Sequence, residues 1–187
     1  MYKKMAAATV AAAFVMLPAT AHAAPAANGP CWAGSWTVAR ATADVAGKKV
    51  AYSVEGGAGT RMTITPSGKR AIVAYDFGTS ASLTGANGSL TMSGADTYTY
   101  TFGGYGPNLH GKVALKPRTG TGGATLIRVG GKGFTGPLRN AVARNEDLGA
   151  IPRKGTYTCV PGTSLRIATY GKSGTTTVAI AWDLTRA

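Results

Sequence analysis

Hydrophobic and polar residues alternate along most of the chain after about residue 60, which is the pattern of half-buried β-strands. Met62 and Ile64 alternate with polar neighbours, and threonines alternate with Tyr98, Tyr100 and Phe102. Further segments with β-branched or aromatic residues between turn residues predict strands at 70–75, 82–86, 89–92, 112–116, 124–129, 156–160, 164–170 and 175–186. The pattern therefore predicts about nine or ten short strands joined by tight turns.

Turn residues refine this prediction at two places, and one segment departs from it. Pro66-Ser67-Gly68-Lys69 predicts a turn, and Asn87-Gly88 between two short strands is the strongest signal for a two-residue hairpin. Pro137, followed by Leu138, Ala141 and Val142 on one side, predicts one short helix near residues 137–145.

Many short strands joined by turns favour an antiparallel barrel or sandwich over a parallel sheet with crossover helices. We expect an all-β fold, a single antiparallel up-and-down β-barrel of about 8–10 strands. In such a barrel the first and last strands pair, which would bring Trp36 beside Trp182 and Arg186. Trp36 would close one end of the barrel with Arg186 lying across its indole, a contact worth about 0.5–2 kcal/mol.

The first thirty residues have the pattern of an export signal. Lys3 and Lys4 precede an apolar run from Met5 to Leu17, and Ala21-His22-Ala23 offers small residues to a signal peptidase. As a helix the run would span about 20 Å, less than the roughly 30 Å core of a bilayer. We expect a signal peptide at 1–23, a tail at 24–30, one domain at 31–187, and a secreted protein without a membrane span after cleavage.

Export would bring the two cysteines, Cys31 and Cys159, into an oxidising compartment. The sequence therefore predicts a disulfide between them. It would close a loop of about 130 residues and tie the first strand to a strand near the C-terminus.

The chain is basic, with 20 Lys and Arg against 7 Asp and Glu. Loss of Lys3 and Lys4 with the signal peptide would lower the formal net charge from +13 to +11. The basic residues are scattered, in runs of no more than two and without interleaved aromatic residues, which favours a basic solvated surface over a specific nucleic-acid site. Such a surface attracts anions such as cell-wall polymers.

No catalytic or metal-binding constellation is apparent. After cleavage His110 is the remaining histidine, expected in an exposed loop, so a His-dependent triad or a multi-histidine metal site is not expected. Glu146 and Asp147 are adjacent and would diverge on a strand, and residues 170–174 lack the first glycine of a phosphate-binding loop. We expect no enzyme activity, no metal and no cofactor.

The Gly34-x-Trp36 opening and the Trp182-x-Leu184-x-Arg186 ending resemble those of the calycins, which are the lipocalins and their relatives, including avidin-type barrels. They also resemble small secreted lipocalin-like proteins of high-GC Gram-positive bacteria, a group of unassigned activity. The resemblance implies a structural, fold-closing role for Gly34, Trp36, Trp182 and Arg186. It does not imply biotin binding, because no tryptophan lies between Trp36 and Trp182.

Two functional hypotheses follow. The resemblance implies a secreted, non-enzymatic barrel that binds a small hydrophobic or amphipathic ligand, with Tyr98, Tyr100 and Phe102 lining the cavity. Ordinary core packing is the commoner explanation of such a stripe of aromatic residues on one face of a strand. The alternative is a filled barrel that acts as a cationic surface-interaction module. Its loops would bind an anionic cell-envelope polymer or a protein partner, such as a secreted hydrolase that it inhibits.

Overall fold

The computed structural model describes residues 29–47, 51–103, 109–130, 133–147, 149–173 and 176–187. The predicted signal peptide, residues 1–23, lies outside the described residues. No helix in the described ranges is long and apolar enough to cross a membrane.

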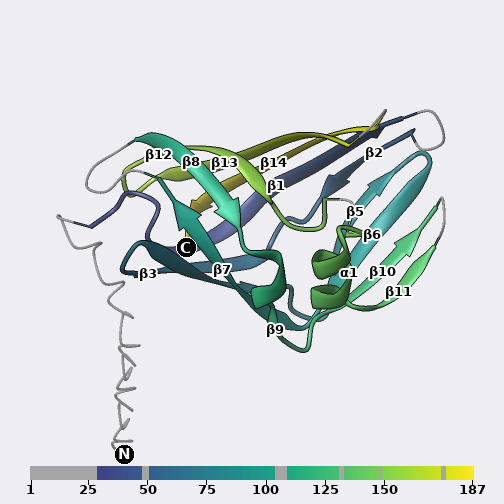
Figure 1. Cartoon of the computed structure of the whole chain (residues 1–187), viewed down its shortest axis with the longest axis horizontal. Coiled ribbons are helices and arrows are strands. Elements are labelled where there is room, and N and C mark those ends of the chain that lie inside the picture. The colour runs from purple at the N-terminus through teal and green to yellow at the C-terminus, as the bar shows by residue number, and fades with distance from the viewer. Residues whose placement is uncertain (1–28, 48–50, 104–108, 131–132, 148, 174–175) are drawn as a thin grey trace, which may run out of the picture.

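Eight antiparallel strands close into a barrel, which confirms the predicted fold class (Figure 1). Each strand pairs with the next and the last pairs with the first. In order around the barrel they are β1 (Gly34–Ala46), β3 (Arg61–Ser67), β4 (Arg70–Asp76), β7 (Ala95–Phe102), β8 (His110–Leu115), β12 (Lys154–Val160), β13 (Ser164–Ser173) and β14 (Thr176–Arg186). This is an up-and-down order, interrupted by three excursions of the chain.

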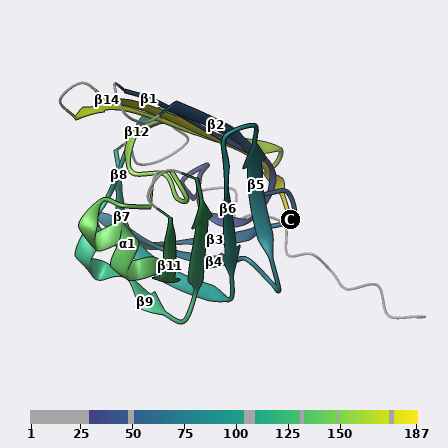
Figure 2. The ribbon, with the colours of Figure 1, turned by 90° about the vertical axis from the view of Figure 1, so that its right-hand side faces the viewer.

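The three excursions build a second sheet of five strands beside the barrel (Figure 2). Its strands, in spatial order, are β2 (Ala51–Gly56), β5 (Ala81–Gly85), β6 (Gly88–Ser93), β10 (Thr125–Val129) and β11 (Phe134–Pro137). The third excursion also holds η1 (Pro117–Thr119), β9 (Thr121–Gly122), which pairs with β7, and α1 (Leu138–Arg144), the short helix expected near residues 137–145.

Strand β1 connects the barrel to this five-stranded sheet, because it pairs with strands of both. Its residues 34–37 pair with β3, whereas residues 41–46 pair with β2. A bulge between Val38 and Arg40 lies where the partner changes. Because a bulge bends a strand and raises its twist, it lets the two sheets diverge from one continuous strand.

One end of the barrel is closed by the first and last strands together. Trp36 pairs with Arg186 in the β1–β14 register, and the Arg186 guanidinium lies 4.8 Å from the centroid of the Trp36 ring. The buried Trp36 indole donates a hydrogen bond to the Trp32 carbonyl at 3.0 Å. The predicted disulfide is present here and joins Cys31 to Cys159 on β12.

Aromatic side chains fill the barrel interior over the described residues. Those that are at most 4% exposed are Trp32, Trp36, Tyr75, Phe77, Tyr98, Tyr100, Phe102, Tyr157 and Trp182. Tyr75 packs edge-on against Trp182 with ring centroids 5.6 Å apart, and Trp32 stacks on Phe102 at 4.5 Å. The core therefore occupies the barrel axis.

The segment between α1 and β12 closes part of the other end. Ala150 and Ile151 on this segment are fully buried. Gly149 lies so close to the inner face of β1 and β14 that a Cβ there would come within 2.8 Å of the Ala43 Cβ. The Tyr100 hydroxyl donates a hydrogen bond to the Pro152 carbonyl at 2.8 Å, which anchors the segment to the core.

Candidate functional site

A hollow of about 430 Å³ lies where this segment meets the inner face of β13 and β14. We call it the mouth hollow, defined by Asp147, Arg153, Lys154, Lys172, Val178 and Ile180, with further contributions from both strands. It forms because the chain leaves α1 through Asn145, whose left-handed φ of 61° ends the helix and turns the following residues toward the barrel.

The walls of the mouth hollow differ in chemistry. Val178 and Ile180 alternate with outward-facing residues along β14 and give it an apolar floor. The exposed Lys154 and Lys172 bring two cationic side chains to its rim. Tyr170, which is 72% exposed, adds an aromatic ring at the edge.

Asp147 is the buried charged residue of this site, and sequence reasoning missed it. Its side chain is 1% exposed, and Oδ1 accepts hydrogen bonds from Nε of Arg153 at 3.0 Å and from Nη2. Arg153 Nη2 also donates to the Val142 carbonyl at 2.8 Å. No hydrogen bond to Asp147 Oδ2 is made within the described residues.

The expectation that Glu146 and Asp147 would diverge rested on a strand, but both follow the left-handed cap of α1. Glu146 is exposed, and its carbonyl accepts a hydrogen bond from Arg128 at 2.8 Å. Asp147 turns inward to Arg153. Two opposite charges six residues apart were the available signal, but the sequence pattern gives no indication of the turn that brings them together.

The predicted ligand-binding residues Tyr98, Tyr100 and Phe102 lie in the packed interior rather than along the mouth hollow. The Tyr98 hydroxyl donates to Asp96 Oδ2 at 2.9 Å, and the Tyr100 hydroxyl lies 2.8 Å from that of Tyr75. Burial raises the pKa of both Tyr98 and Tyr100 well above the ordinary value, so these hydroxyls stay protonated. Their role as ligand contacts stays a prediction, whereas Tyr100 holds the segment that borders the mouth hollow.

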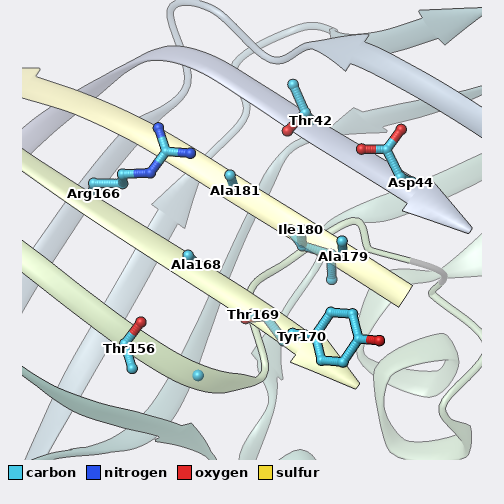
Figure 3. A pocket seen from close by; sticks show the side chains of 11 residues that line it. Thr42, Asp44, Thr156, Arg166, Ala168, Thr169, Tyr170, Ala179, Ile180 and Ala181 are labelled. Carbon is cyan, nitrogen blue, oxygen red and sulfur yellow. The ribbon is translucent and has the colours of Figure 1, made fainter. Parts of the chain in front are cut away.

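A second hollow, of about 480 Å³, lies on the outside of the barrel across β12, β13, β14 and β1 (Figure 3). Its floor is a cross-strand row of small residues in which Ala168 pairs with both Thr156 and Ala181, and Ala181 with Thr42. Tyr170 and Asp44 stand at one end and Arg166 at the other. Arg166 is held by an ion pair to Asp183.

His110 is exposed, as expected, but it begins β8 instead of lying in a loop, because it pairs with Thr158 on β12. Within the part of the chain that the structure describes, no three His, Cys, Asp or Glu side chains gather as a metal site would require.

No family model, curated protein or solved structure matches this chain. The closed, antiparallel, eight-stranded barrel supports the resemblance to calycins at the level of the fold.

Proposed function

We propose that the chain is a binding protein that holds a small amphipathic molecule in the mouth hollow. The observation that carries this proposal is a concave site of about 430 Å³ with an apolar floor and a few polar groups around it. Sites for small molecules have this size and composition. The filled barrel axis argues for the mouth, rather than the Tyr98, Tyr100 and Phe102 stripe, as the place where a ligand binds.

Each wall has a part in binding. The apolar portion of the molecule packs on Val178 and Ile180 and leaves water, which is the main source of affinity. Lys154 and Lys172 border the opening at the rim, where both side chains keep their ammonium groups hydrated. The Tyr100–Pro152 hydrogen bond fixes the opposite wall.

The cellular setting belongs to the same proposal. We infer that residues 1–23 direct export and that the mature chain works outside the cell as a calycin-like barrel. The Cys31–Cys159 disulfide supports this inference, since disulfides persist in oxidising compartments.

The test is native mass spectrometry of the oxidised protein purified from its own secretion medium, compared with a denatured spectrum. Extra mass that disappears on unfolding supports the proposal. Val178→Trp fills the mouth hollow and should abolish the extra mass, whereas Ala179→Trp puts the same side chain on the outer face of β14 and should keep it. Equal uptake by both variants would place the ligand elsewhere.

A second candidate function is an anion-binding surface. It is favoured because several of the carboxylates are already paired with arginines or buried. Glu55, Asp147 and Asp183 form ion pairs with arginines, and Asp96 is buried. Of the 7 acidic residues, three therefore remain to offset the other cations. Retention on a heparin column at low salt, lost as salt is added, would support binding of an envelope polyanion, and passage without retention would rule it out.

A further inference from the structure

One oxygen of the buried Asp147 carboxylate receives no hydrogen bond within the described residues. Asp147 lines the mouth hollow with its side chain 1% exposed, so water in bulk does not solvate the carboxylate. Oδ1 is occupied by Arg153, and Oδ2 receives no hydrogen bond within the described residues. Buried polar atoms in native proteins almost always have a partner, and the hollow that Asp147 lines is a place from which a partner can come.

A carboxylate oxygen only accepts hydrogen bonds, so the partner must donate one. A hydrocarbon, an ether, a carboxylate or a fully ionised phosphate has no proton to give. A hydroxyl, an amide N–H or an ammonium does. The requirement for a donor therefore excludes purely apolar ligands and ligands whose sole polar group is a simple anion.

The charges around Oδ2 favour one kind of hydrogen-bond donor over another. An ammonium would be attracted by Asp147, but the same hollow is lined by Arg153, Lys154 and Lys172. Three cations against one carboxylate disfavour a further positive charge. An uncharged donor avoids this repulsion and still satisfies Oδ2.

We propose that the mouth hollow selects an amphiphile with a hydroxyl head, which donates its hydrogen bond to Asp147 Oδ2 while the alkyl part lies on Val178 and Ile180. This inference rests on the proposed binding function and specifies its ligand class. Arg153 acts as a positioning residue, because its guanidinium binds Oδ1 and leaves Oδ2 without a hydrogen bond from the described residues.

The experiment compares four probes of equal chain length on the full oxidised chain: octanol, octyl methyl ether, octylamine and octanoate. We expect octanol to bind about tenfold or more tightly than the ether, because a hydrogen bond to a charged acceptor is worth that factor. Octylamine, charged at neutral pH, should bind more weakly than octanol. Calorimetric titration gives each dissociation constant.

The Asp147→Asn variant should remove or reverse the preference for octanol over octyl methyl ether. With its amide oxygen bonded to Arg153, the amide nitrogen takes the place of Oδ2 and donates instead of accepting. The preference for octanol over the ether should fall below about twofold or reverse. Asp44→Asn makes the same change on the outer face and should leave the preference intact.

The outcomes separate the two proposals. Binding of none of the probes overturns the binding function itself. Equal affinity for octanol and its ether in the unmodified chain overturns the head-group inference and leaves the binding function standing, with Oδ2 satisfied by water. That comparison needs no variant, so it decides the matter even if Asp147→Asn does not fold.

Discussion

Gly34 shows how one residue type makes the closure at the disulfide end of the barrel feasible. Its φ of +118° suits glycine, and a Cβ there would lie 2.6 Å from Arg186 Nη1. The guanidinium over Trp36 therefore occupies the space that a side chain at position 34 would need. This is the physical reason for a glycine two residues before the tryptophan.

Gly34→Ala should accordingly displace Arg186 from the Trp36 ring and force a strained backbone. We expect a loss of about 1–3 kcal/mol in the free energy of unfolding, measured by denaturant titration. Gly123→Ala is the control, because a Cβ there meets nothing within 4 Å. Equal stability of the two variants would mean that Arg186 does not depend on the glycine.

The two arginine–aspartate pairs on opposite sides of the barrel wall differ in burial and should differ in energy. Arg153→Met removes the partner of Asp147 inside the protein. The free energy of unfolding should fall by about 3–5 kcal/mol, because a buried charge is left without a partner. In Arg166→Met the partner Asp183 is 38% exposed and is solvated, so the cost should stay below about 1 kcal/mol. Thermal unfolding of both variants tests this, and similar losses would contradict the burial argument.

At the scale of elements, the alternation of apolar and polar residues was enough to predict most strands, and Pro137 with the apolar residues that follow it was enough to predict the position of α1. The Asn87-Gly88 hairpin was wrong by one residue. Gly85 pairs with Gly88, so Ala86 and Asn87 form the turn, and neither has a positive φ. Gly88 instead lies in β6, where a Cβ would come 2.6 Å from the Val129 carbonyl oxygen. Turn propensity is local, whereas the approach of β10 to this glycine is a long-range contact.

Gly88→Ala should therefore loosen the pairing of β6 with β10 rather than the hairpin. We expect faster amide hydrogen exchange in β10, with exchange in β1 and β14 unchanged, because the second sheet opens apart from the barrel. Gly133→Ala is the matched control, since its Cβ would make an ordinary 3.5 Å contact with the Arg128 carbonyl. Protection lost equally in β10 and β14 would show that the two sheets open together.

The division of strands between two sheets, and with it the candidate site, was not predictable from the sequence. The sequence pattern around the Val38/Arg40 bulge does not indicate that β1 changes partner there. The same holds for Asp147 and Arg153, whose meeting depends on the turn at Asn145 and on the inner face of β14. Local patterns predict elements, whereas the pairing of distant elements makes the hollow.

The whole molecule has one sealed end and one end that carries the mouth hollow. The disulfide, Trp36 and Arg186 seal the first, as the sequence pattern at the two ends of the domain predicts. Between the two ends, Tyr75, Tyr98 and Tyr100 form a buried cluster, in which Tyr100 reaches the Pro152 segment. The stability of the barrel and the shape of the mouth hollow are therefore linked through neutral phenols.

Alkaline pH should break this link. Burial raises the pKa of Tyr75, Tyr98 and Tyr100 above the ordinary 10.0, so above pH 10 the unfolded chain loses protons that the folded chain keeps. The free energy of unfolding should then fall by about 1.4 kcal/mol per pH unit for each tyrosine, or about 4 kcal/mol for the three together. Tyrosinate absorbance of the cluster should rise together with the loss of the β-sheet circular dichroism signal, and Tyr75→Phe should reduce the slope by about a third. Full ionisation of the tyrosines with the circular dichroism unchanged would show that the cluster is open to solvent.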